Sequence, residues 1–174
     1  MNDLTVLGLD PGLSLGWALL RGDNLLGYGT FRPDPNLPRD RRDQQYRHLA
    51  ALAGRLLDEK RPGLVAIEEP YTPTWARGKE LNRRAREALQ LSKLVILLVA
   101  EAARRGLETV MVKPEDGFRA LTGSPRNDKR LRRKMVKGRF ACAGPDPPNE
   151  HETSAVGVAL RAQAEAIHEK AKER

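Results

Sequence analysis

Two short apolar runs without polar alternation stand out along this chain, and each ends in a carboxylate. Residues 6–9 are followed by Asp10, and residues 64–67 are followed by Glu68. Unalternating runs of this length are typical of buried parallel strands, and ligands bind at the carboxyl ends of such strands in open α/β sheets. The pattern therefore predicts that Asp10 and Glu68 lie side by side, in a geometry suited to Mg²⁺ or Mn²⁺.

The remaining strand signals follow the same α/β pattern. Residues 4–9 form the first expected strand, and residues 16–20 and 25–31 alternate around a polar turn, which predicts a hairpin. Together these three strands make an antiparallel meander. Residues 64–67 and 108–112 supply a fourth and a fifth strand.

Helical spacing of apolar residues predicts the other elements. The expected helices cover residues 43–60, 80–105, 114–121, 127–138 and 149–174. The second half of the 80–105 helix is apolar nearly all round, so we expect the sheet and a partner subunit to cover it. The last ten residues of the chain are polar enough to fray.

Length and composition indicate one domain spanning residues 1–174, since 174 residues with 40% hydrophobic content can bury one substantial core. Cys142 is the single cysteine, which excludes an intramolecular disulfide framework and favours a cytoplasmic protein. We expect neither a signal peptide nor a membrane segment, because the longest apolar run, residues 94–100, is too short to span a bilayer.

The net charge of +8 is concentrated in one part of the chain. Residues 104–139 carry twelve Lys and Arg against four acidic residues, so the rest of the chain is neutral overall. A basic block on an otherwise balanced protein indicates a polyanionic partner, and nucleic acid is the interpretation we favour over a solvated helix face.

Phosphodiester hydrolysis by two metal ions needs ligands for ions roughly 4 Å apart, which is more than two carboxylates supply. The candidates for the remaining ligands are Glu69, which points to the other face of the strand from Glu68, and the residues that open the last helix. His151 and Ser154 share a helix face, as do Glu150 and Ser154. A histidine ligand would favour Mn²⁺ over Mg²⁺.

Glu152 has a competing structural explanation. Asn149 followed by Glu152 three residues later fits a capping box, in which the glutamate binds the backbone amide of the cap residue. We nevertheless keep Glu152 with His151 and Ser154 as candidate catalytic residues, beside Asp10 and Glu68. Asp10, Glu68 and His151 are the candidate metal ligands.

An ordered set of motifs carries a family resemblance over nearly the whole chain. The motifs are GLDPG at 8–12, GWA at 16–18, AIEE at 66–69, AREAL at 85–89, ILL at 96–98, Pro114, Gly123, Arg126, DK at 128–129 and AVGVAL at 155–160. On these residues the chain resembles the RuvC family of Holliday junction resolvases. The resemblance implies an RNase H-like fold, an α/β fold with a five-stranded mixed sheet in the order 3-2-1-4-5 flanked by helices.

The resemblance further implies a homodimer that nicks a four-way DNA junction using Mg²⁺ or Mn²⁺, two ions per site, with no small-molecule cofactor. Asp10 and Glu68 match the first two metal-binding acids of the family. Tyr71 falls at a loop aromatic that stacks on junction bases, with Trp75 as the alternative. The expected DNA-binding residues are Tyr71, Trp75, Arg77, Lys79, Arg119, Arg126, Lys129, Arg132 and Arg133.

The last helix departs from the family pattern of two ligands three residues apart. The matching positions are His151 and Ser154, and serine is a weak metal ligand. Either Glu150 or Glu152 substitutes, or Ser154 holds a water, or activity is reduced. So divergent an arginine-rich version suggests a mobile-element resolvase, acting in a bacterial or phage-infected cell and cutting branched DNA generally.

Three alternatives remain open. The fold could act on RNA or on other branched DNA, and the protein could bind junctions without cutting them. A sugar-kinase or actin-like phosphate binder is the third, since residues 10–14 (DPGLS) loosely resemble its first phosphate loop. Such proteins need a second Asp-Gly phosphate loop and about twice this length, and this sequence has neither.

Overall fold

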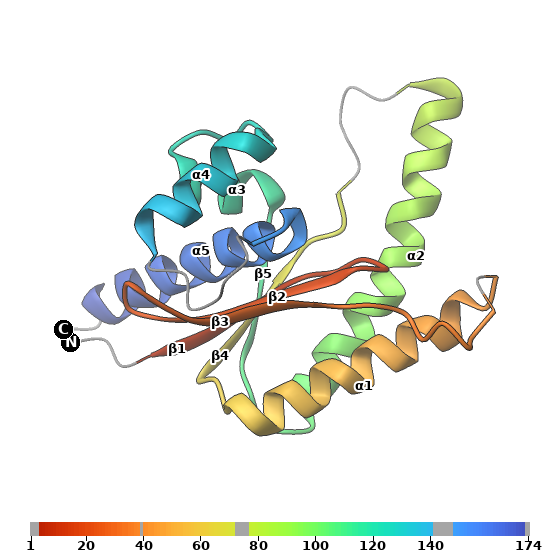
Figure 1. The fold of residues 1–174 in the computed structure, drawn as a ribbon, viewed down its shortest axis with the longest axis horizontal. Helices are drawn as coiled ribbons and strands as arrows, with labels where there is room; N and C mark the ends of the chain where they lie inside the picture. Colours follow the sequence, from red (N-terminus) through yellow and green to blue (C-terminus); the bar gives the residue numbers. More distant parts are fainter. Residues whose placement is uncertain (1–3, 39, 72–76, 141–147, 173–174) are drawn as a thin grey trace.

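A five-stranded mixed sheet forms the centre of the computed structural model, which describes residues 4–38, 40–71, 77–140 and 148–172 (Figure 1). The strands are β1 (Thr5–Asp10), β2 (Leu15–Arg21), β3 (Asn24–Phe31), β4 (Leu64–Glu68) and β5 (Thr109–Val112). Their spatial order is β3-β2-β1-β4-β5, with antiparallel pairing from β3 to β1 and parallel pairing from β1 to β5. This arrangement confirms the predicted fold class and strand order.

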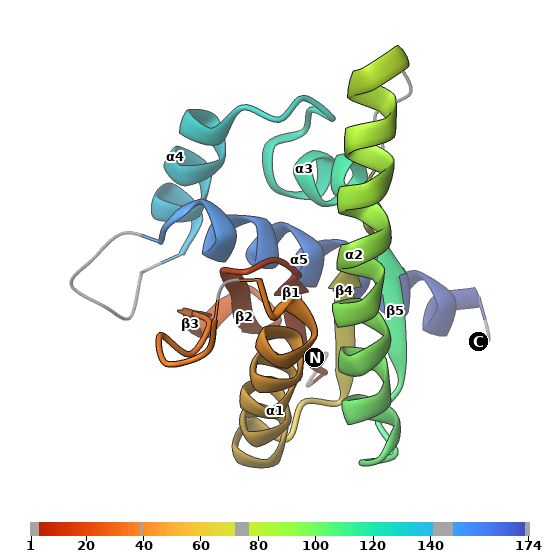
Figure 2. The same ribbon diagram turned by 90° about the vertical axis from the view of Figure 1, so that its right-hand side faces the viewer.

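Helices cover both faces of the sheet. They are α1 (Arg42–Lys60), α2 (Gly78–Ala103), α3 (Pro114–Thr122), α4 (Lys129–Arg139) and α5 (Glu150–Lys172). Helices α1 and α2 lie on one face, and α5 crosses the other with α3 and α4 packed on its outer side (Figures 1 and 2).

The alternation of side chains along the central strands explains the two cores. In β1, Leu7 and Leu9 join the core under α1 and α2, whereas Val6 joins the core under α5. A strand that is covered on both faces needs an apolar residue at nearly every position, and residues 6–9 and 64–67 have this pattern. The sheet therefore explains the unalternating runs.

Glycines allow α5 to approach the sheet closely. A Cβ atom on Gly8 would lie 2.2 Å from the carbonyl oxygen of Ala155, and one on Gly16 would lie 2.4 Å from that of His151. Gly157 makes a similar close approach to Gly117 of α3. These contacts hold the first turns of α5 directly over the carboxyl end of β1.

The polar end of α5 is helical. Helix α5 continues to Lys172, so the polar residues expected to fray are helical as far as the structure describes them, with lysines in the negatively polarised last turn.

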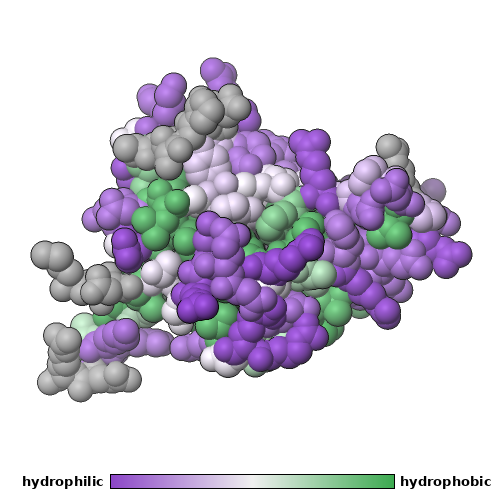
Figure 3. All heavy atoms as spheres, turned by 60° about the horizontal axis from the view of Figure 1, so that its bottom comes forward, coloured by the Kyte–Doolittle hydropathy of each residue, from purple (hydrophilic) through white to green (hydrophobic). Residues whose placement is uncertain are grey.

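Two large apolar side chains of α2 are exposed to solvent, Leu89 at 67% and Ile96 at 66%. Apolar patches also interrupt the charged surface on the side of the molecule that carries α1 (Figure 3). No helix in the described ranges is long and apolar enough to cross a membrane.

Candidate active site

The register of the sheet brings two carboxylates together. Leu9 of β1 pairs with Ile67 of β4 in parallel, and the next residue in each strand is the acid, Asp10 or Glu68. Both strands end there, so the two side chains occupy neighbouring positions at the carboxyl edge of the sheet. The structure thus places these acids as the apolar runs predict.

Burial and mutual repulsion make this pair of acids reluctant to ionise. Burial, followed by the charge of Asp10, raises the pKa of Glu68 to about 8. Burial also raises the pKa of Asp10, although a hydrogen bond with His151 opposes it. Within the described residues, Oε2 of Glu68 is buried without a hydrogen-bond partner. A positive charge beside these oxygens would relieve both penalties.

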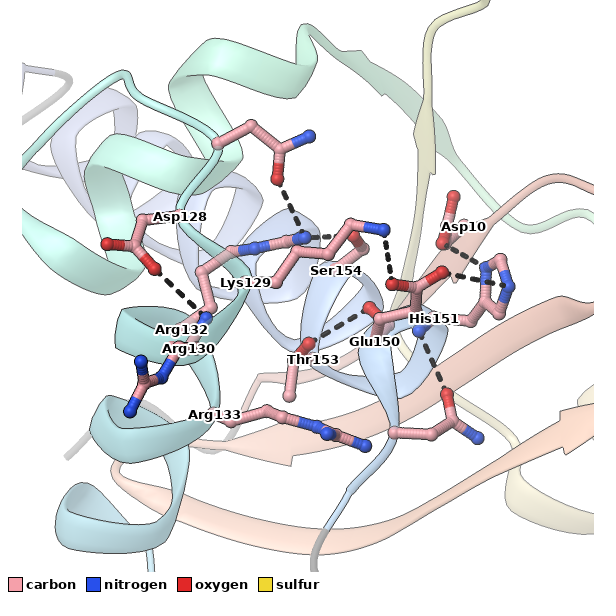
Figure 4. A network of polar contacts seen from close by, with 12 residues as sticks. Asp10, Asp128, Lys129, Arg130, Arg132, Arg133, Glu150, His151, Thr153 and Ser154 are labelled. Carbon is pink, nitrogen blue, oxygen red and sulfur yellow. Dashed lines mark hydrogen bonds and ion pairs between the residues drawn. The ribbon is translucent and has the colours of Figure 1, made fainter.

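The N-terminus of α5 supplies the third group of the site. Nδ1 of His151 lies 3.1 Å from Oδ2 of Asp10, whose side chain is only 13% exposed (Figure 4). This contact raises the pKa of His151 above its ordinary value. The expected ligands Asp10, Glu68 and His151 therefore come from three elements, β1, β4 and α5.

Glu152 does not face this site. Its Oε2 accepts a hydrogen bond from the backbone N–H of Asn149 at 2.7 Å, and its Oε1 accepts one from the hydroxyl of Thr30 at 3.0 Å. The Asn149 side chain in turn accepts from the backbone N–H groups of His151 and Glu152. The capping box that the sequence predicted is present, and it accounts for Glu152, which we withdraw as a catalytic candidate.

Ser154 faces the site but already has a partner. Its hydroxyl accepts a hydrogen bond from Nη1 of Arg132 in α4 (Figure 4). Arg132, one of the expected DNA-binding residues, is only 3% exposed, so its side chain lies inside the protein and not on the exposed basic surface. It occupies the buried stripe of α4 with Val136 and Phe140, at spacings of four and eight residues. This spacing was the only local sign in the sequence that Arg132 is buried, and the many charged residues around it obscured that sign.

Glu150 and Lys129 form an ion pair at the rim of the site. Nζ of Lys129 lies 2.6 Å from Oε2 of Glu150, and Oε1 of the same glutamate lies 3.9 Å from Nε2 of His151. The lysine hydrogen bond is the main reason that the pKa of Glu150 lies below its ordinary value. Glu150 is therefore charged but already neutralised by an exposed lysine.

A cavity of about 480 Å³ opens beside Glu68. Its lining includes the aromatic rings of Tyr71 and Phe118, and Tyr71 is 45% exposed. Arg77 and Lys79, which follow in the chain, are also exposed. Trp75, the alternative aromatic candidate, lies outside the described residues.

The other expected DNA contacts are distributed over α3 and α4. Arg126 and Arg133 are exposed, and Nε of Arg133 donates to the carbonyl of Pro148 at 3.3 Å. Arg119 pairs with Asp116 and lines a different cavity, together with Arg139 and Arg161. The residues of the basic block are therefore spread over more than one surface, and only some of them lie near the site.

No family model matches the chain, but comparison with individual known proteins identifies its family. It is 31% identical over 153 residues to the crossover junction endodeoxyribonuclease RuvC of Streptomyces coelicolor, covering 83% of this chain and 74% of that protein. The chain belongs to the RuvC family. RuvC of Heliobacterium modesticaldum is 28% identical over 162 residues, covering 89% of this chain and 92% of that one.

Solved structures agree on the fold. RuvC of Thermus thermophilus in complex with Holliday junction substrate superposes with a TM-score of 0.72 at 23% identity, covering 95% of this chain and 96% of that chain. The yeast mitochondrial Holliday junction resolvase Ydc2 gives a TM-score of 0.58 at 12% identity. These matches confirm the fold, and the 31% identity to the Streptomyces coelicolor protein confirms the family resemblance drawn from the sequence motifs. The relatives of this family are named as endonucleases.

Proposed function

We propose that this RuvC-family protein is a metal-dependent endonuclease that resolves four-way DNA junctions by paired nicks. The observation that carries the proposal is the juxtaposition of Asp10 and Glu68 at the carboxyl ends of two neighbouring parallel strands. The names of its relatives, crossover junction endodeoxyribonucleases, supply the substrate class.

The residues at this site fit a divalent cation. Oε2 of Glu68 is buried with no hydrogen-bond partner among the described residues, and its pKa is raised to about 8, so an ionised pair of acids needs a counterion. Carboxylate oxygens suit Mg²⁺, and a histidine nitrogen tilts the preference toward Mn²⁺. Asp10, Glu68 and His151 would hold the ion. Across the described ranges, however, no group of three His, Cys, Asp or Glu side chains is preorganised around one metal position.

Each residue has a definable part in the reaction. A bound divalent cation would supply Lewis acidity for phosphodiester hydrolysis. The carboxylates of Asp10 and Glu68 hold positive charge where the scissile phosphate must lie. His151 contributes a ring nitrogen once it has lost the proton that its contact with Asp10 favours. The Lys129–Glu150 ion pair at the rim leaves a lysine close enough to exchange its partner for a DNA phosphate.

The cavity beside Glu68 supports a role in holding a distorted junction. Tyr71 and Phe118 offer aromatic surface, and stacking of an unpaired base on such a ring is worth roughly 1–3 kcal/mol. The exposed Arg126 and Arg133, with Arg77 and Lys79, supply charge for the phosphate backbone.

We also propose that the protein acts as a homodimer through α2. Leu89 and Ile96 expose most of their surface on this helix, whose first half extends beyond the sheet (Figures 1 and 2). Two copies packed along this surface would bury these side chains and would present two sites to one junction.

A second candidate is a protein that binds junctions without cutting them. The observation that favours it is the engagement of Ser154 with Arg132 at a position where the family pattern expects a ligand. A third possibility keeps the nuclease chemistry but broadens the substrate to other branched DNA or RNA.

One experiment distinguishes these three candidate functions. A labelled four-way junction is incubated with the wild type and with Asp10→Asn, in Mg²⁺ and separately in Mn²⁺, and binding is measured by gel shift in EDTA. We expect symmetric nicks that the variant loses while it retains binding. Glu59→Gln, an exposed acid on α1, is the control. Tight binding without nicking in either metal would support the binding-only protein, and equal cutting of flaps or structured RNA would support the broader nuclease.

A further inference from the structure

Arg132 is a buried cation beside two buried acids. Its guanidinium donates from Nη1 to the hydroxyl of Ser154 (Figure 4) and from Nη2 to Oδ1 of Asn127 at 2.9 Å. The guanidinium also lies 4.6 Å over the ring of Phe118. Its Nε is buried with no hydrogen-bond partner among the described residues. Such a group is expensive to bury unless an opposite charge stabilises it.

The opposite charges are those of Glu68 and Asp10. Burial lowers the pKa of Arg132, and attraction to Glu68 and then to Asp10 opposes that effect. The same attraction lowers the pKa of both acids against the effect of their burial. Arginine stays charged in proteins, so the guanidinium is a permanent positive charge within this acidic site.

The charge balance of the site then limits how many metal ions it can accept. Asp10 and Glu68 bring two negative charges and Arg132 brings one positive charge. Glu150 is already paired with Lys129, and Glu115, which lines the cavity with Glu68, acts on Glu68 more weakly than Arg132 does. One divalent ion together with one phosphodiester group makes this set neutral. A second divalent ion would leave an excess of two positive charges in a partly buried site, which is strongly unfavourable.

Ser154 fits the same arrangement. A serine hydroxyl is a neutral acceptor that holds the guanidinium in place, whereas a carboxylate there would neutralise the arginine by forming an ion pair with it. The hydrogen bond between the arginine of α4 and the serine of α5 therefore holds one positive charge within electrostatic reach of the acids.

We infer that the Arg132 guanidinium, held by Ser154, stands in for a second metal ion, so that each active site takes one divalent cation. This inference rests on the proposed metal-dependent nuclease site. Arg132 acts through the charge that it places beside Asp10 and Glu68, and it is thus a positioning residue for the ion and the phosphate.

The test measures Mn²⁺ binding directly. Free Mn²⁺ is followed by electron paramagnetic resonance during titration of the metal into the full chain without DNA. We expect saturation at one ion per chain for the wild type. Arg132→Met removes a repulsive positive charge, so Mn²⁺ should bind about three- to tenfold more tightly. Nicking of a four-way junction by the same variant should fall about a hundredfold or more, because the phosphate loses a stabilising charge.

Two further variants test whether the effect on Mn²⁺ binding comes from the charge at position 132. Arg132→Lys retains the charge, and we expect Mn²⁺ affinity within about twofold of the wild type. Arg130→Gln removes an exposed arginine from the same helix and should leave Mn²⁺ binding unchanged. If Arg132→Met fails to fold, the wild-type stoichiometry and the lysine variant still decide the matter.

The outcomes separate this inference from the proposed function. Two Mn²⁺ ions per wild-type chain would overturn the inference while leaving a nuclease intact, as would unchanged or weaker Mn²⁺ binding in folded Arg132→Met. A third outcome is one ion per chain and tighter binding in Arg132→Met, but no nicking by the wild type. It would support the inference and contradict the proposed activity. No saturable Mn²⁺ binding would overturn both.

Discussion

Nδ1 of His151 and Oδ2 of Asp10 lie 3.1 Å apart, which joins the first turn of α5 to the end of β1. The contact raises the pKa of His151 above 6.5, and the protonated ring cannot ligate a metal ion. We therefore expect nicking to rise with pH as His151 loses its proton, with a midpoint above 6.5 at low Mn²⁺. Higher Mn²⁺ should move the midpoint to lower pH, because the metal competes with the proton.

Initial nicking rates across pH at two Mn²⁺ concentrations test this expectation. His151→Gln should lower the rate and abolish the midpoint. An unchanged profile in that variant would assign the midpoint to Glu68, whose pKa of about 8 lies in the same range.

Glu68→Gln should stabilise the metal-free protein while it abolishes nicking. The folded state keeps Glu68 protonated up to about pH 8, whereas the unfolded chain ionises it near its ordinary pKa of 4.5. Glu68 therefore reduces the free energy of unfolding progressively as pH rises from about 4.5 to 8. Glutamine does not titrate, so we expect it to add roughly 1–3 kcal/mol at pH 8 and little at pH 4.5.

Urea unfolding in EDTA at both pH values measures this effect. Saturating Mn²⁺ should stabilise the wild type far more than the glutamine variant. An equal difference between the two proteins at both pH values would contradict the assignment, since only a titrating group gives a pH-dependent difference.

Gly8→Ala should destabilise the protein severely. The added Cβ would lie 2.2 Å from the carbonyl oxygen of Ala155 and 2.9 Å from the Cβ of Ala159, so α5 must move away from the sheet. We expect a loss of about 2–4 kcal/mol in the free energy of unfolding. Gly138→Ala in α4 is the matched control, since no atom of the described residues lies within 4 Å of an added Cβ and alanine favours a helix by up to about 1 kcal/mol. Equal stability of the two variants would refute the close approach.

Arg126→Ala should weaken junction binding through charge alone. Arg126 is exposed within the basic block, so its loss should reduce affinity at low salt and lower the slope of log affinity against log salt by about one. Gel shifts in EDTA over a range of salt concentrations give that slope. Unaltered slope and affinity would place Arg126 outside the DNA interface.

The sequence predicted the parts of the site that depend on local pattern. Asp10 and Glu68 were found because an apolar run that ends in an acid marks the end of a buried strand, and the Asn149–Glu152 cap was found because capping has a fixed spacing. Both signals reside within a few residues of the chain.

Arg132 could not be found in the same way. Helix α4 has seven Lys or Arg among its 11 residues, a composition that indicates a solvated face. Which of these residues is buried depends on how α4 packs against α5, and Ser154 lies 22 residues away in sequence. Composition therefore predicts that the helix binds DNA, but it does not single out the arginine of α4 that faces inward.

The close fit of α5 over Gly8 and Gly16 has a consequence for the order in which this protein matures. Asp10 is synthesised some 140 residues before His151 and the helix α5 that carries it. A nascent chain can pair β1 with β4 well before α5 exists to cover the other face of the sheet. The site is therefore complete only after α5 has been synthesised and has packed over the sheet.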